Sequence, residues 1–209
     1  MTRHEPDTDE LLVLAGRGDQ AAAEQLLVRH RGRLRQMIAL RLDGRLRARV
    51  DPSDVLQDTL AEAARKLAVY ARDRPLPFYP WLRRLAWERL VQLHRWHVRT
   101  GKRSVKREEA WLPLPDESAV QLADRLASRG SSPSARLQRS EMRARVQEAL
   151  ARLSDRDREV LVLRYLEHLS TREIAAVLGL AESGVKTRQL RALQRLRDLL
   201  DDNHAEDMA

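Results

Sequence analysis

The sequence predicts an all-α protein with two small helical domains joined by a flexible linker. Apolar residues recur every three or four positions almost everywhere outside residues 101–140, which is the period of amphipathic helices. Strands would instead show runs of alternating β-branched residues, and the sequence has none. With 209 residues, of which 43 % are hydrophobic and 33 % charged, the chain can bury one substantial core or two small ones.

The first domain is predicted over residues 10–100, and its clearest helix start is "DPSD". The carboxylate of Asp51 can cap the helix, Pro52 suits the first helical position, and Asp54 favours the positive end of the helix dipole. The predicted helix starts in this half lie near Glu10, after Gly18-Asp19, after Asp51-Pro52 and after Pro80.

Residues 101–140 interrupt the helical pattern. They hold three of the eight prolines and a Gly-Ser-Ser-Pro-Ser stretch, so they predict an inter-domain linker in which a short helix over 120–127 can form. The periodic pattern returns over residues 141–200, the predicted second domain. The acidic tail, residues 201–209, is predicted to be disordered.

The second domain begins with a predicted helix, "EMRARVQEALARL", and two capped helices follow. Ser154 with Asp157 forms a capping-box-like start for "DRDREVLVLRYLEHL", and Ser170 with Glu173 repeats the device for a helix over 171–178.

The segment "REIAAVLGLAESGVKTR" predicts a helix-turn-helix. Its first helix spans two turns and ends at Gly179, the residue type best able to adopt a left-handed conformation. A second helix starts near Glu182, and Ala175 is small enough for the two helices to cross closely. The second helix would then lie in a DNA major groove. An ordinary helical hairpin inside a bundle is the alternative. Apolar residues expected to fill the wedge are Ile174, Leu178, Leu180 and Val185.

Basic and hydroxyl side chains follow the polar side of this second helix, whereas Val185, Ala192, Leu193 and Leu196 face inward. An arginine that reaches a guanine edge contributes roughly 1–3 kcal/mol of discrimination, while contacts to phosphates are sequence-blind and salt-sensitive. The predicted DNA-binding residues of this helix are Ser183, Lys186, Thr187, Arg188, Arg191 and Arg195.

The net charge of +8 and the pI near 10.6 favour an anionic polymer as the partner. The chain has no cysteine, which excludes disulfides, thiolate zinc sites and a cysteine nucleophile. The N-terminus has no apolar run and no eighteen apolar residues follow one another, so we expect a cytoplasmic protein that does not enter a membrane.

The stretch from "LSDRDREVLVL" to "RALQRLR" resembles the second conserved domain of bacterial RNA polymerase sigma factors of the sigma-70 family, specifically the small two-domain extracytoplasmic-function (ECF) group. This resemblance implies that residues 141–200 read the promoter −35 element. Similar helix-turn-helix domains occur in response regulators.

The first half resembles the same family at "DPSDVLQDTLAEAARKL", where Asp54, Val55, Gln57 and Asp58 match the helix that docks on the clamp coiled coil of the polymerase. Without the family, Asp54, Asp58 and Glu62 fall four apart and form one acidic stripe, which suits a basic protein partner better than DNA. A solvated helix face is the alternative. The predicted polymerase-binding residues are Asp51, Asp54, Gln57, Asp58 and Glu62.

"YARDRPLPFYPWLRRLAWERLVQLHRWHVR" resembles the family segment that melts and holds the −10 element. Six of the eight aromatic residues lie between residues 70 and 96, interleaved with arginines, as single-stranded DNA binding requires. Phe78, Trp81 and Trp87 can instead be core residues, which we expect for Trp81, and the loop over 72–77 is the better candidate for a base pocket. The predicted −10 contacts are Arg72, Arg74, Phe78, Tyr79, Arg83, Arg84, Arg89, Gln92 and Arg95.

The resemblance implies a promoter-specificity subunit rather than an enzyme, with no cofactor and no metal. One or two captured bases return roughly 1–3 kcal/mol each, whereas unstacking on the order of ten steps costs about 14 kcal/mol, so a large partner must supply the remainder. Implied partners are core RNA polymerase, through its β′ clamp and β flap, and promoter DNA. An anti-sigma factor is a further candidate partner.

Other classes remain as alternatives. A free-standing helix-turn-helix regulator would leave the acidic stripe as ordinary surface. A serine recombinase would need a mixed α/β domain, and no strands are predicted before residue 140. His94 and His97 are the one histidine pair at ligand spacing, and no carboxylate at matching spacing accompanies them.

Overall fold

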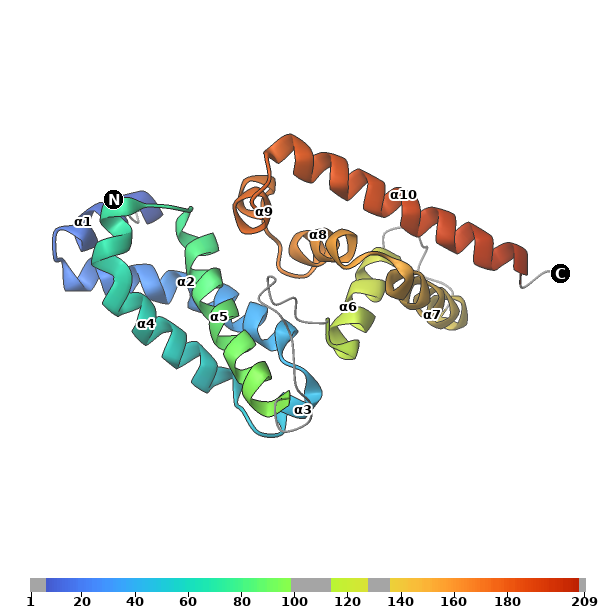
Figure 1. The fold of residues 1–209 in the computed structure, drawn as a ribbon, viewed down its shortest axis with the longest axis horizontal. Helices are drawn as coiled ribbons and strands as arrows, with labels where there is room; N and C mark the ends of the chain where they lie inside the picture. The colour runs from blue at the N-terminus through green and yellow to red at the C-terminus, as the bar shows by residue number, and fades with distance from the viewer. Residues whose placement is uncertain (1–6, 99–113, 128–135, 207–209) are drawn as a thin grey trace. The chain divides into compact units, whose positions relative to one another are not determined.

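The protein is all-helical and divides into two compact units, residues 1–113 and 114–209, in the computed structural model. The structure describes residues 7–98, 114–127 and 136–206, and all regular structure in these ranges is α-helix (Figure 1). This confirms the predicted fold class. None of the helices in these ranges combines the length and the apolar character that a membrane crossing requires.

Unit 1 is a bundle in which α2 packs against α1, α4 and α5 (Figure 1). Its core is made of fully buried aliphatic side chains such as Leu26, Ile38 and Leu82. The helices are α1 (Thr8–Gly16), α2 (Gln20–Arg41), α3 (Gly44–Arg47), α4 (Pro52–Asp73) and α5 (Phe78–Val98).

The predicted starts of α2 and α4 are confirmed by their caps. The carboxylate of Asp19 accepts a hydrogen bond from the Ala22 amide at 3.0 Å, and that of Asp51 accepts one from the Ser53 amide at 2.7 Å. Pro52 occupies the first position of α4, where a missing N–H removes no helical hydrogen bond. Both caps therefore act on amides only two or three residues further along the chain.

Two other starts lie earlier than predicted. α1 begins at Thr8 because Asp7 and Glu10 form a reciprocal capping box. α5 begins at Phe78 and contains Pro80 in its first turn, a position whose amide has no helical acceptor. The short α3 was not predicted.

Unit 2 contains five helices in the described ranges, and α6 is one of them. The sequence placed residues 101–140 in a linker, but α6 packs against α7 and α8 and buries Leu122 and Ala123. α6 therefore belongs to unit 2, while residues 101–113 and 128–135 lie outside the described residues. The helices are α6 (Asp116–Ala127), α7 (Arg136–Arg152), α8 (Asp155–Tyr165), α9 (Thr171–Leu178) and α10 (Glu182–Glu206).

The predicted acidic tail is also partly helical. α10 continues to Glu206, so the disorder expected from residue 201 is wrong for residues 201–206. Residues 207–209 lie outside the described residues.

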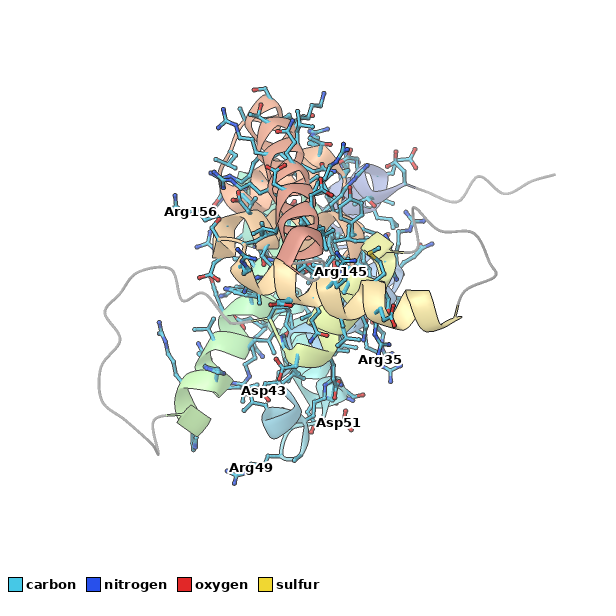
Figure 2. The ribbon with its side chains drawn as sticks, turned by 90° about the vertical axis from the view of Figure 1, so that its right-hand side faces the viewer. Arg35, Asp43, Arg49, Asp51, Arg145 and Arg156 are labelled. Atoms are coloured by element: carbon cyan, nitrogen blue, oxygen red, sulfur yellow. The ribbon has the colours of Figure 1, made fainter. Side chains whose placement is uncertain are left out.

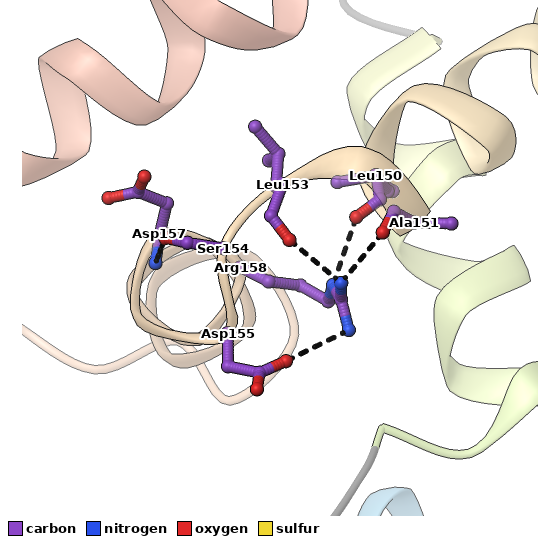
Figure 3. A network of polar contacts seen from close by, with 7 residues as sticks. All are labelled: Leu150, Ala151, Leu153, Ser154, Asp155, Asp157 and Arg158. Atoms are coloured by element: carbon purple, nitrogen blue, oxygen red, sulfur yellow. Dashed lines mark hydrogen bonds and ion pairs between the residues drawn. The ribbon is translucent and has the colours of Figure 1, made fainter.

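The junction between α7 and α8 is closed by one arginine (Figure 3). Arg158 Nε donates to the carbonyl of Leu150 at 2.9 Å, and its Nη2 donates to the carbonyls of Ala151 at 3.1 Å and Leu153 at 2.9 Å. Nη1 also lies 3.5 Å from Asp155 Oδ1. The last carbonyls of a helix have no amide donors in the following turn, and here the Arg158 guanidinium donates to those of Leu150 and Ala151 and to that of Leu153, just beyond α7.

Candidate nucleic-acid interface

The helix-turn-helix of unit 2 is built by the capping residues that the sequence predicted. The Glu173 amide donates to Ser170 Oγ at 3.2 Å, and the Ser170 amide donates to Glu173 Oε2 at 2.8 Å. Gly179 ends α9 in the left-handed conformation, with φ 63° and ψ 34°. The Leu180 amide then donates to the Ala175 carbonyl at 3.0 Å, which closes the turn.

The crossing of α9 and α10 has the predicted apolar interior. Ile174 and Val185 are fully buried, and Ala175 is 8 % exposed at the crossing. Leu178 and Leu180 are half-buried. Further along α10, Ala192 and Leu196 are buried and Leu193 is half-buried, which fixes the side of α10 that faces α7 and α8.

The opposite side of α10 carries most of the predicted DNA contacts. Ser183, Lys186, Thr187 and Arg191 are exposed, and Arg188 is half-buried. Exposed cations along a helix that projects from a helix-turn-helix can reach both phosphates and base edges.

Arg195 differs from the other predicted contacts of α10. Its Nη1 is ion-paired with Asp157 Oδ2, and the Asp157 side chain is only 9 % exposed. This pairing also explains why Asp157 does not complete a capping box with Ser154, although the Asp157 amide does donate to Ser154 Oγ at 3.2 Å. Arg195 therefore ties α10 to the start of α8.

Two glycines in this motif provide a matched stability test. Gly179→Ala is expected to lower the free energy of unfolding by about 1–2 kcal/mol, because its φ of 63° is costly for a residue with a Cβ although no atom lies within 4 Å of that Cβ. Gly184→Ala, in helical conformation with only an ordinary 4.0 Å contact, is expected to raise it by about 0.4–1 kcal/mol. Urea unfolding of the full chain measures both, and equal effects of the two substitutions would contradict the left-handed cap.

The predicted acidic stripe lies along α4 in unit 1. Asp51, Asp54, Gln57 and Asp58 are exposed and Glu62 is half-buried. Figure 2 shows Asp51 at the end of unit 1 where α3 leads into α4.

Two members of the stripe have cationic partners. Glu62 pairs with Lys66 at 2.6 Å within α4, and Asp58 pairs with Arg89 of α5 at 2.6 Å. The second pair joins the predicted polymerase-binding surface to the predicted −10 surface. Asp54 has no ion pair within the part of the chain that the structure describes.

The predicted −10 residues fall into two groups. Phe78, Tyr79 and Arg83 are 4 %, 3 % and 4 % exposed, so in this structure they offer no surface for a direct DNA contact. The remaining members keep accessible side chains: Arg72, Arg74, Arg84, Arg89, Gln92 and Arg95.

Aromatic packing explains the burial of Phe78 and Tyr79. Trp81 is a core residue, as expected, and its ring lies 4.3 Å from that of Tyr70 and 5.6 Å from that of Phe78. Tyr79 stacks on His30 at 5.9 Å, and the Arg33 guanidinium lies 3.8 Å from the centre of the Tyr79 ring.

Arg83 is buried for a related reason. Its guanidinium lies 5.4 Å from the centre of the Trp87 ring, and that of Arg41, from α2, lies 5.2 Å from the same ring. Cation–π contacts of this kind gain strength where water is excluded. The Arg41–Trp87 contact thus joins α2 to α5, whereas the Arg83–Trp87 contact lies within α5.

The loop predicted over residues 72–77 is shorter in the structure, because α4 continues to Asp73, and residues 74–77 are tethered to α4. Arg74 is left-handed with φ 38°, and the Tyr70 hydroxyl donates to the Leu76 carbonyl at 2.9 Å. Burial raises the pKa of Tyr70 to about 12, against the opposing effect of Arg74, so the phenol stays a donor at neutral pH. The hydrogen bond from Arg72 lowers the pKa of Asp73. A base pocket in this loop stays a prediction.

No cluster of three or more metal-ligating side chains occurs within the described ranges. The side chain of His97 lies outside the described residues, so the His94–His97 pair is untested.

Comparison with known proteins covers both units. Residues 143–196 match the family model described as "Sigma-70, region 4". The RNA polymerase sigma factor CnrH of Cupriavidus metallidurans is 34 % identical over 93 % of this chain and 95 % of its own length. The ECF RNA polymerase sigma factor SigM of Mycobacterium tuberculosis is 31 % identical over 95 % of this chain and 87 % of its own length.

A solved structure is similar in fold as well. The structure of CnrH in complex with the cytosolic domain of CnrY has a TM-score of 0.52 and 29 % sequence identity, and the match covers 94 % of this chain and 99 % of that chain.

Proposed function

The chain belongs to the ECF group of the sigma-70 family of RNA polymerase sigma factors, and on that premise we propose how its surfaces divide the work of promoter recognition. It binds core RNA polymerase, directs it to specific promoters and helps to open the −10 element. The matched family and the two relatives are named as sigma factors, not as enzymes. A protein that works with the polymerase on promoter DNA would act in the cytoplasm.

The observation that carries this function is the end-to-end likeness to CnrH, which covers 93 % of the chain. A free-standing regulator would share its helix-turn-helix with sigma factors but would not need a sigma-like first unit. Because the match spans unit 1 as well as unit 2, the sigma function is favoured over that alternative.

We assign the two DNA contacts to different helices. The exposed cations of α10 suit duplex DNA at the −35 element, since phosphates and guanine edges are both accessible in the major groove. The accessible arginines of α5 suit the −10 element, where Arg84, Arg89 and Arg95 would follow the phosphate backbone.

The β′ clamp is assigned as a partner by charge, because the acidic stripe of α4 would dock on a basic surface there. The β flap is assigned as the partner of unit 2 by the family resemblance. CnrH was solved with the cytosolic domain of CnrY, and a comparable anti-sigma protein is a candidate partner of this chain.

Asp54→Arg provides the sharpest test of polymerase docking. We expect it to weaken binding to core polymerase about tenfold or more, because a like charge at a complementary interface costs over 1 kcal/mol. Asp58→Arg would be a poorer test, since it also places a second cation beside Arg89. Fluorescence anisotropy of labelled full-length chain against core polymerase measures the dissociation constant.

Glu24→Arg is the matched control for Asp54→Arg. Glu24 is also exposed and acidic but lies on α2, outside the stripe, and its carboxylate accepts a 3.4 Å hydrogen bond from the Gln20 side chain. The control is expected to bind core polymerase within about twofold of the wild type. If both variants bind equally well, the docking role of the α4 stripe is wrong.

A further inference from the structure

Helix α6 lies in the segment that the sequence predicts to be linker, yet the structure packs it on α7 and α8. Ser118, Leu122 and Ala123 are fully buried, and Leu126 is half-buried. Because Ser118, Leu122 and Leu126 are four residues apart, they lie on one side of the helix. Gln121, next to Leu122, is exposed. α6 therefore binds the rest of unit 2 through one mostly apolar side, as a helical peptide binds a groove.

Two polar contacts between α6 and the rest of unit 2 lie at the surface. Arg143 Nε, on α7, is 3.7 Å from Asp124 Oδ1, and the two side chains are 47 % and 53 % exposed. Arg125 Nη1 donates to Nε2 of His168 at 2.7 Å, also at an exposed position. Pairs that are open to water add little stability, so α6 is held mainly by its buried side. A helix of 12 residues is marginal by itself, and α6 would therefore unfold on leaving unit 2.

The docking of α6 sets the length of chain that connects the two units. With α6 docked, residues 99–115 connect α5 to α6, and these 17 residues span at most about 60 Å. With α6 released, residues 99–135 connect α5 to α7, and these 37 residues span up to about 130 Å. Release of α6 therefore about doubles the distance that the connection can cover.

The two promoter elements require a reach close to the shorter limit. Their names place them about 25 base pairs apart, which is about 85 Å of straight duplex at about 3.4 Å per base pair. Arg95, a predicted −10 contact, is near the end of α5, so the connecting chain leaves unit 1 at that element. A unit of this size is roughly 30 Å across. The shorter connection and unit 2 together reach about 90 Å only when the chain is fully extended, so docked α6 leaves almost no slack.

We propose that α6 detaches from α7 and α8 when the chain assembles with core RNA polymerase, and that it unfolds to lengthen the connection between the units. The inference rests on the proposed function, because a chain that binds both promoter elements has to hold its units this far apart. In the free chain, docked α6 keeps the connection short and covers the sides of α7 and α8 on which it packs. Assembly then has to supply the free energy that the docking of α6 contributes to unit 2.

The first test compares the affinities of three full-length chains for core polymerase. Leu122→Asp places a charge in the buried side of α6, which releases the helix before assembly. Because this variant no longer gives up the docking of α6, its dissociation constant is expected to fall about 3- to 10-fold, as for a binding-competent state that is about 10–30 % populated in the wild type. Gln121→Asp adds the same charge at an exposed position of the same helix and should bind within about twofold of the wild type.

The second test follows α6 directly and does not depend on the folding of Leu122→Asp. The chain has no cysteine, so one introduced thiol reports on its own position. In the free chain, Ser118→Cys is expected to react with a maleimide about 3- to 10-fold more slowly than Gln121→Cys, because position 118 is fully buried. In the holoenzyme the two rates, measured by mass spectrometry of this chain, should agree within about twofold. Ala192→Cys, buried on α10, should stay protected in both states.

Two results would overturn the inference while the proposed function stands. One is equal or weaker binding of Leu122→Asp to core polymerase, with Ala192→Cys in the same background still protected. The other is a thiol of Ser118→Cys that stays as protected, relative to Gln121→Cys, in the holoenzyme as in the free chain. Failure of the wild-type chain to bind core polymerase would instead overturn the proposed function and, with it, this inference.

Discussion

Replacing Arg158 with alanine is expected to lower the free energy of unfolding of unit 2 by about 2–4 kcal/mol. One guanidinium donates three hydrogen bonds to carbonyls at the junction between α7 and α8 and pairs with Asp155 of α8 (Figure 3). Each hydrogen bond to a charged group contributes about 1.5–3 kcal/mol, but bonds made by one side chain do not add fully. Urea unfolding of the full chain, followed by circular dichroism, measures the change.

Two companion substitutions separate this role from the loss of a surface charge. Arg156 is exposed and its side chain points away from the ribbon (Figure 2), so Arg156→Ala is expected to change stability by less than about 0.5 kcal/mol. Arg158→Lys keeps the charge but loses the planar fork that spans several acceptors, so it should lose most of the stabilisation. Similar stabilities of Arg156→Ala and Arg158→Ala would show that the α7–α8 junction does not depend on this guanidinium.

The helix-turn-helix could be predicted closely because its signals are local. Ser170, Glu173 and Gly179 each act within four residues of the backbone groups that they satisfy. Because the groups that a cap satisfies are close in the chain, the capping pattern in the sequence is enough to predict where the helix begins or ends. The same holds for Asp51 and Pro52 at the start of α4.

The parts that could not be predicted depend on partners far away in the chain. Tyr79 and Arg83 resemble DNA contacts in the sequence, but Tyr79 packs on His30 and Arg83 shares the Trp87 ring with Arg41. An amphipathic pattern predicts which side of a helix is buried, but it does not decide whether a residue at the edge of that side is buried or exposed. Residues at the edge of that side are therefore decided by the helix packed against them.

Ion pairs between residues far apart in the chain also connect surfaces that the sequence analysis assigns to different partners. Asp58 and Arg89 are 31 residues apart and were assigned to different partners, yet they form an ion pair. Arg195 was grouped with the DNA contacts of α10, but its partner Asp157 lies 38 residues earlier. The proline and serine residues that flank α6 predict a linker, whereas its packing on α7 and α8 places it in unit 2. No spacing rule predicts pairings of this kind from one sequence.

Replacing Lys186, Arg188 and Arg191 together with alanine is expected to have the largest effect on DNA binding. If each side chain contacts a phosphate, the slope of log affinity against log salt should become shallower by about 2.7, at about 0.9 per contact. If one of the arginines also reads a guanine edge, discrimination between promoters should fall by an additional 1–3 kcal/mol, or about 5- to 150-fold. Fluorescence anisotropy of holoenzyme with a selected −35 duplex, across a series of salt concentrations, separates the two contributions.

The same helix supplies the control for this triple substitution. Arg197 is highly exposed in the distal half of α10, away from the turn after α9, and lies 3.8 Å from Asp201, so Arg197→Ala should leave both the affinity and the salt slope nearly unchanged. Because both proteins lose charge from α10, a general electrostatic effect would weaken binding in each in proportion to the charge removed. A salt slope that falls by a similar amount per charge in Arg197→Ala and in the triple variant would mean that α10 contributes only net charge. A change confined to the triple variant would instead place the DNA contact on the first turns of α10, next to the turn that Gly179 forms.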